Sequence, residues 1–188
     1  MLVTFAKLSL RQYGVSAVLD SGQRMLGPGP NGEAPGNDQH MPHDLAHFLV
    51  EAELGLRLGV FGQLAAGEAG IFRPEATERK AKRVRRGRQV RAAGRGDINA
   101  SERLVWLCVS EWERLAGRRS QPMEMLPTNT GDVPPERLER AISRLDLESA
   151  RWRALEVGES MTLTWPPHLT VRPGKSQLTK GREHQHDR

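Results

Sequence analysis

The sequence contains a single cysteine, Cys108, among its 188 residues, and therefore cannot form a disulfide within the chain. This cysteine lies in an apolar run from residue 104 to residue 109, which is typical of a small buried hydrophobic residue. Long apolar stretches are also absent, since no run approaches the roughly 18 residues of a membrane-spanning helix. Residues 1–7 lack the charged and apolar regions of a signal peptide. We therefore expect a cytoplasmic protein without membrane contact.

Acidic side chains are absent between residues 79 and 95, where nine cations exceed the net charge of +5 of the whole chain. Such a cluster can neutralise phosphates and release counterions, which predicts an accessory nucleic-acid-binding function. The cluster contains no aromatic residue for base stacking and no recognised DNA- or RNA-binding motif. A solvated charged loop and a contact with an acidic protein partner stay open as alternatives. The predicted binding residues are Arg79, Lys80, Lys82, Arg83, Arg85, Arg86, Arg88 and Arg91, and Arg95 ends the cluster.

Strand patterns occur at both ends of the chain. Apolar residues alternate from Tyr13 to Leu19, and a turn at residues 20–23 leads into a short partner strand that ends at Leu26. Residues 2–10 also read as a strand, although their alternation does not decide which face is buried. Residues 161–165 alternate again before two prolines. We predict that this last strand pairs with the N-terminal hairpin.

Helical patterns fill the middle of the chain. We predict helices from Pro42 to Gly55, from Val60 to Ala66, from Asn99 to about Ala116, and from Pro134 onward. Asn99 and Glu102 have the spacing of a capping box. The fold class is therefore α+β, with a small antiparallel sheet and about four helices packed on one face. We expect one domain over residues 1–172, an exposed basic segment over residues 73–97, and a disordered tail over residues 173–188.

The most distinctive chemical pattern is the spacing of His43, His47 and Glu51 at i, i+4 and i+8. On a helix these residues lie within a stripe of about 80°, and two imidazoles one turn apart can chelate one metal ion. The pattern predicts a site for zinc or another divalent metal, with His40 and Glu53 as further sources of ligands. Two alternatives stay open. One is structural: His43 lies at the helix start and His47 packs in the core with a backbone partner. The other is a different catalytic use of these residues.

The run from His43 to His47 resembles the HExxH motif of zinc peptidases, with Asp44 in place of the glutamate base. Because aspartate is shorter, its carboxylate would stand roughly 1–1.5 Å further from a metal-bound water, and we do not expect peptidase activity. The same residues resemble the HDxxH motif of a zinc-dependent protein family in ubiquinone biosynthesis. That motif continues with a glutamate twelve residues after the second histidine, where this chain has Gly59.

A wider resemblance covers most of the chain. Its elements are the N-terminal hairpin, the PHDLAHF helix at residues 42–48, a helical middle rich in tryptophan, and the LTWPP sequence at residues 163–167. This order resembles uncharacterised small proteins of high-GC bacteria that have no established function. The resemblance implies the fold and a bacterial context, and it implies no activity.

The sequence leaves three functional hypotheses open. The favoured one is a metal-binding helix that carries His43 and His47, with activity and substrate left open. The second is nucleic-acid binding through residues 79–95. The third is a protein-interaction module without catalysis, which predicts an exposed apolar patch.

Overall fold

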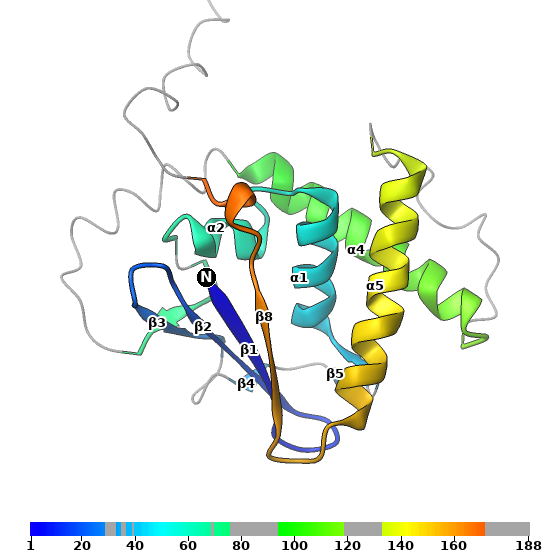
Figure 1. The fold of residues 1–188 in the computed structure, drawn as a ribbon, viewed down its shortest axis with the longest axis horizontal. Coiled ribbons are helices and arrows are strands. Elements are labelled where there is room, and N and C mark those ends of the chain that lie inside the picture. Colours follow the sequence, from blue (N-terminus) through cyan, green and yellow to red (C-terminus); the bar gives the residue numbers. More distant parts are fainter. Residues whose placement is uncertain are drawn as a thin grey trace, which may run out of the picture.

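An antiparallel sheet with helices packed on one face forms the protein, and this confirms the predicted α+β fold (Figure 1). The structure is a computed structural model, and it describes residues 1–28, 33–34, 37–38, 40–68, 70–75, 94–118 and 133–171. The predicted tail and most of the predicted basic segment lie outside these residues.

Five strands run in the order β7-β3-β2-β1-β8, so the C-terminal strand pairs with the N-terminal hairpin as predicted. The bounds are β1 (Leu2–Lys7), β2 (Tyr13–Val18), β3 (Arg24–Leu26), β7 (Arg73–Pro74) and β8 (Ser160–Thr164). Three two-residue strands complete the pairing: β4 (Glu33–Ala34) joins β2, and β5 (Asn37–Asp38) pairs with β6 (Met41–Pro42).

The register of β1 settles which face of the first strand is buried. Val3 lies opposite Ala17 on β2 and Leu163 on β8, and all three side chains are buried. Leu2, one residue earlier, is 47% exposed on the outer face. Because side chains alternate along a strand, the odd-numbered residues of β1 face the helices.

Within the described residues, four α-helices lie on one side of the sheet, and α1, α4 and α5 contact one another (Figure 1). Their bounds are α1 (His43–Leu54), α2 (Val60–Ala65), α4 (Arg95–Leu115) and α5 (Pro135–Ala154), and a 3-10 turn, η2 (Pro167–Leu169), follows β8. No helix within the described ranges has both the length and the hydropathy that a membrane crossing needs.

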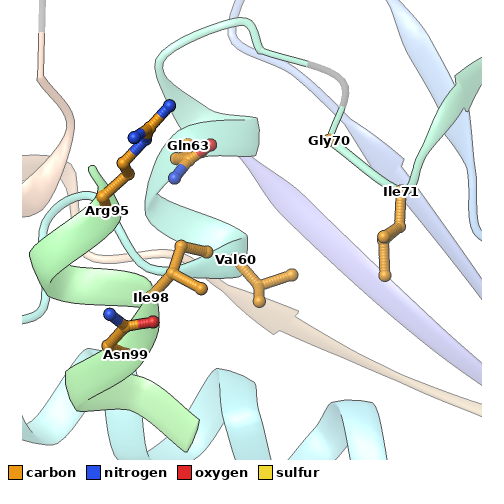
Figure 2. Close-up of a pocket in the computed structure, with 7 residues that line it drawn as sticks. All are labelled: Val60, Gln63, Gly70, Ile71, Arg95, Ile98 and Asn99. Atoms are coloured by element: carbon orange, nitrogen blue, oxygen red, sulfur yellow. The ribbon is translucent and has the colours of Figure 1, made fainter. Parts of the chain in front are cut away.

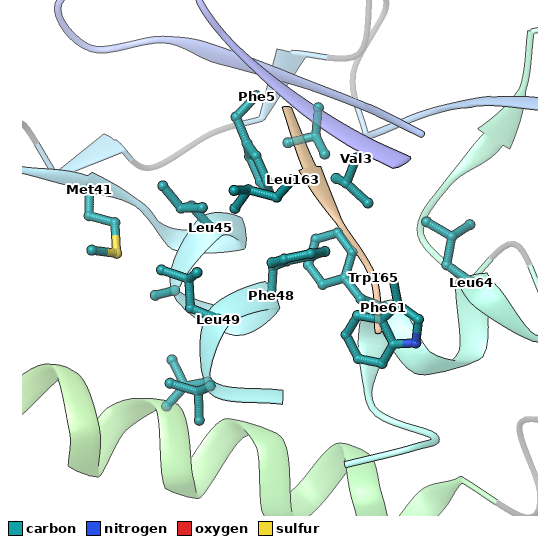
Figure 3. Close-up of a cluster of buried hydrophobic side chains, with 14 of the residues drawn as sticks. Val3, Phe5, Met41, Leu45, Phe48, Leu49, Phe61, Leu64, Leu163 and Trp165 are labelled. Atoms are coloured by element: carbon teal, nitrogen blue, oxygen red, sulfur yellow. The ribbon is translucent and has the colours of Figure 1, made fainter. Parts of the chain in front are cut away.

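The core lies between α1 and the sheet, where aromatic rings from separate elements meet (Figure 3). Phe48 of α1 packs edge-on against Phe5, Phe61 and Trp165, with centroid distances of 6.1, 5.3 and 5.7 Å. Such edge-to-face pairs add to the free energy that apolar burial provides. Nine of the twelve residues of α1 are buried, so packing holds the helix along most of its length.

Helix α4 begins at Arg95, four residues before the predicted capping box at Asn99. Gly94 precedes it in a place where a Cβ atom would lie 2.5 Å from the Gln63 amide nitrogen. The glycine thus allows a close approach of α2 and α4. The Asn99–Glu102 capping box is a wrong prediction.

The two described ends of the predicted exposed segment over residues 73–97 belong to secondary-structure elements, and Arg73, Glu75, Arg95 and Gly96 are exposed. Arg73 and Pro74 form β7, which pairs with Leu26 and Met25 of β3. Residues 95–97 begin α4. A two-residue strand has no periodicity of its own, so only its partner strand reveals it.

The stretch rich in glycine and proline that follows β3 contains the two-residue strands β4 and β5. Of the four tryptophans, Trp112, Trp152 and Trp165 are buried, whereas Trp106 is 42% exposed.

Candidate metal centre

Helix α1 brings the rings of His43 and His47 together, as their spacing predicts. The ring centroids lie 4.5 Å apart at an angle of 75°, and the two Nε2 atoms are 3.1 Å apart. Two nitrogen ligands held at 2.0–2.1 Å by a tetrahedral zinc ion lie about 3.3 Å from each other. Both Nε2 atoms can therefore reach one ion after a small adjustment of the rings.

A carboxylate joins the pair from α4. The ligand atoms of His43, His47 and Glu102 all lie within 4.8 Å of one another, and Oε2 of Glu102 is 3.7 Å from Nε2 of His47. His47 is buried, while His43 and Glu102 are exposed. The group therefore combines one rigid ligand with two ligands that solvent can reach.

His47 is oriented by a chain of buried hydrogen bonds on its other ring nitrogen. Its Nδ1 lies 2.9 Å from Oγ of Ser101, and that hydroxyl donates to Oε1 of Glu51 at 2.7 Å. His47 is 2% exposed, and Ser101 and Glu51 are fully buried. Metal-ligating histidines commonly have such a partner on the second nitrogen, because it fixes the ring orientation and the tautomer.

The tautomer of neutral His47 follows from these bonds. The single hydroxyl proton of Ser101 goes to the Glu51 carboxylate, so Ser101 accepts a proton from Nδ1 of His47. Nε2 of His47 is then unprotonated and accepts from Nε2 of His43. The lone pair that a metal requires already points toward the candidate centre.

The environment of His43 favours the neutral form that a metal ligand requires. Partial burial and the neighbouring His47 lower the pKa of His43 from its ordinary value. Asp44 and Glu102 act in the opposite direction and are smaller causes. Less competition from protons helps metal binding near neutral pH.

Glu51, the third predicted ligand, has a different set of partners. Its two oxygens accept the backbone N–H groups of Val60 and Phe61, at 2.7 and 2.9 Å, at the start of α2. Oε1 also accepts from Ser101 and lies 3.8 Å from Nδ1 of His47. The structure thus places Glu51 behind His47, on the side away from Glu102.

Gly59 makes this arrangement of Glu51 possible. A Cβ atom at residue 59 would lie 2.4 Å from the carboxyl carbon of Glu51. The glutamate of the HDxxH family would stand at this position, and here its side chain would collide with Glu51. This resemblance therefore does not extend to a third ligand.

Asp44 does not occupy the position of a catalytic base. Its Oδ2 accepts from the Tyr13 hydroxyl at 3.1 Å, and its own backbone N–H donates to the same oxygen of Tyr13. Burial raises the pKa of Asp44, and the bond from Tyr13 opposes that shift. Asp44 therefore joins the start of α1 to β2.

The other residues singled out in the sequence lie elsewhere. Glu53 pairs with Arg144 of α5 at 2.5 Å, and the His40 carbonyl accepts from Ser149 of α5. Neither belongs to the group around His47. Cys108 is fully buried, and burial raises its thiol pKa to about 12, so it is not a reactive nucleophile.

The nucleic-acid hypothesis concerns residues that the structure does not describe. Arg79 to Arg91 lie outside the described ranges, and Arg95 is the first residue of α4. One observation bears on the protein-interaction hypothesis, which predicts an exposed apolar patch. Leu2 and Val18 pair across β1 and β2, and their side chains are 47% and 40% exposed. Both hypotheses stay predictions.

Comparison with known proteins adds no assignment. No protein-family model, no curated protein and no solved structure matches the chain. Function is therefore inferred from the geometry of His43, His47 and Glu102.

Sequence reasoning identified two of the three clustered residues and missed Glu102 and Ser101. Ser101 and Glu102 lie between Asn99 and Arg103, so the sequence carries no signal that separates them from the other polar residues of α4.

Proposed function

We propose that this protein binds a divalent transition-metal ion, preferably zinc, through His43, His47 and Glu102. The observation that carries the proposal is the pair of Nε2 atoms 3.1 Å apart, with a carboxylate beside them and His47 anchored from behind. The ligands come from two helices whose packing the hydrophobic core determines. This packing supports the proposal, because it holds the three side chains near one another.

The donor set favours zinc among the common cations. Imidazole nitrogens suit zinc, copper, iron and nickel, whereas calcium and magnesium take oxygen ligands. Two histidines and one carboxylate are a ligand set that zinc enzymes use, and the fourth position of the tetrahedron then binds water or a substrate. Zinc lowers the pKa of a bound water to about 7, so hydrolytic or lyase chemistry is the class to screen.

Metal binding has a local cost in this site. The ion replaces the hydrogen bond between the two histidines, and His43 must move its proton to Nδ1 to free Nε2. A net hydrogen bond contributes about 1 kcal/mol, which is small beside the free energy of structural zinc binding. The bond between the rings is therefore compatible with a metal site.

The test measures zinc stoichiometry and affinity on the full, untagged chain. His184 and His186 lie outside the described residues and can bind metal independently, so every protein carries His184→Ala and His186→Ala. Mass spectrometry gives the metal content, and competition with a chromogenic chelator gives the dissociation constant. We expect about one zinc ion per chain, because the three ligands complete one site.

Variants of the ligands separate this site from chance binding. The double variant His43→Ala/His47→Ala is expected to weaken zinc binding by at least about 100-fold, and Glu102→Gln by about tenfold. Cobalt(II) absorption then reports whether the coordination is tetrahedral. Equal zinc affinity in the parent and in the double histidine variant, with circular dichroism showing both folded, would refute the proposal.

A further inference from the structure

A second polar feature of the fold is a pocket between α2, the turn at residues 70–71 and the first turns of α4 (Figure 2). Its volume is about 570 Å³, which lies within the range of small-molecule sites. None of its lining residues belongs to the candidate metal centre. The lining residues are Val60, Gln63, Gly70, Ile71, Arg95, Ile98 and Asn99.

Branched aliphatic side chains give the pocket an apolar part. Val60 comes from α2 and Ile98 from α4, and Ile71 projects from the opposite side (Figure 2). Ile71 is 53% exposed, so a large part of its side chain is in contact with water. A ligand with an apolar body would remove this surface from water, at about 25 cal/mol per Å² of apolar area.

The polar part of the pocket carries a positive charge. Among the described residues, Arg95 is the one cationic residue that lines the pocket, and no hydrogen bond or ion pair joins its guanidinium to another described residue. The carboxylate of Asp97, two residues later, accepts the backbone N–H of Leu58 at 2.7 Å. Asn99 and the buried Gln63 add amide groups beside Arg95.

We propose that this pocket binds a small organic anion, namely a carboxylate with a short aliphatic body. Arg95 pairs with the carboxylate, since a guanidinium presents two parallel donors to a carboxylate. Val60, Ile71 and Ile98 contact the aliphatic body. The first turn of α4, where the helix dipole is positive, lies at the same end as Arg95 and favours an anion there. This site is separate from the proposed metal function and does not depend on it.

The isoleucines of the chain make a direct test available. There are three, of which Ile71 and Ile98 line the pocket and Ile142 lies on α5 as an internal reference. The full chain is labelled at its isoleucine methyl groups and titrated with hexanoate by NMR. We expect saturable shifts of the first two methyl signals and no change at Ile142.

Two comparisons identify the role of the charge. Hexanamide has a similar shape and no charge, and we expect it to bind about fivefold more weakly. Arg95→Gln is expected to weaken hexanoate binding by about the same factor. Arg140→Gln removes an exposed arginine of α5 outside the pocket, and its affinity for hexanoate should equal that of the parent.

The proposal fails under any of three results. These are the absence of saturable shifts up to about 10 mM hexanoate, equal affinity for hexanamide, and unchanged affinity in Arg95→Gln. A folded methyl spectrum of each variant, with Ile142 in its parent position, shows that a loss of binding comes from the pocket.

Discussion

Two carboxylates approach His47 from opposite sides at nearly the same distance, and they have different roles. Glu51 lies 3.8 Å from Nδ1 and Glu102 lies 3.7 Å from Nε2. Glu51 is fully buried and accepts two backbone N–H groups and a hydroxyl, whereas the Glu102 side chain is 63% exposed. A carboxylate whose lone pairs are already occupied supports the fold, and one that solvent can reach is available to a ligand.

The largest expected effect is the difference in the free energy of unfolding between variants of the two carboxylates. Glu51→Ala should lower the free energy of unfolding by about 3 kcal/mol, because it leaves two amides and the Ser101 hydroxyl unsatisfied in the interior. Glu102→Ala should change it by less than about 0.5 kcal/mol. Urea denaturation of both variants measures the difference. Similar losses in the two proteins would show that Glu51 is not the buried anchor that its contacts indicate.

A second comparison tests whether the position of Glu51 depends on the space at Gly59. Gly59→Ala places a Cβ atom 2.4 Å from the carboxyl carbon of Glu51 and should destabilise the protein by about 1–3 kcal/mol. Gly96→Ala is the matched control, because its Cβ atom meets no neighbour and alanine favours the helix. We expect the control to be neutral or slightly stabilising in thermal unfolding. A neutral Gly59→Ala would mean that the Glu51 carboxylate can move without loss.

A third, smaller effect concerns how His47 is held for metal binding. Ser101→Ala removes the acceptor of the Nδ1 proton, and zinc affinity should fall by about tenfold as ring orientation is lost. Ser110→Ala is a matched control, since Ser110 is also buried on α4 and is absent from the centre. Chelator competition measures both. An equal change in the two variants would indicate a general effect on α4 in place of an effect on His47.

The elements with strong periodicity were predictable from the sequence. The alternation in Tyr13 to Leu19 gave β2, and α1 follows from its apolar residues and from Pro42 and Gly55. The contact between the two histidines was also predictable, because it depends only on helix geometry. These features are local, and short-range steric rules determine them.

The partners of the histidines were not predictable, because they depend on packing between distant segments. Ser101 is 54 residues from His47, and its place follows from how α4 crosses α1. The helical stripe correctly grouped Glu51 with His47, but it could not show that the α2 amides lie against that carboxylate. The choice between Glu51 and Glu102 is thus a tertiary property.

Asp44 is a third carboxylate to compare with Glu51 and Glu102, because it is buried like Glu51 but accepts fewer hydrogen bonds. Burial raises its pKa, so the unfolded chain loses this proton at a lower pH than the folded protein does. The protonated Asp44 carboxyl therefore contributes to the stability of the folded protein. This contribution is complete below the ordinary pKa of 3.8, and it is lost as the pH rises through the pKa that Asp44 has in the folded protein. Asp44→Asn keeps an acceptor for Tyr13 and removes this dependence, so its stability relative to the parent should increase from about pH 4 toward neutrality. Urea midpoints of both proteins across this range measure the effect. A constant difference would show that the hydrogen bond from Tyr13 offsets the effect of burial on Asp44.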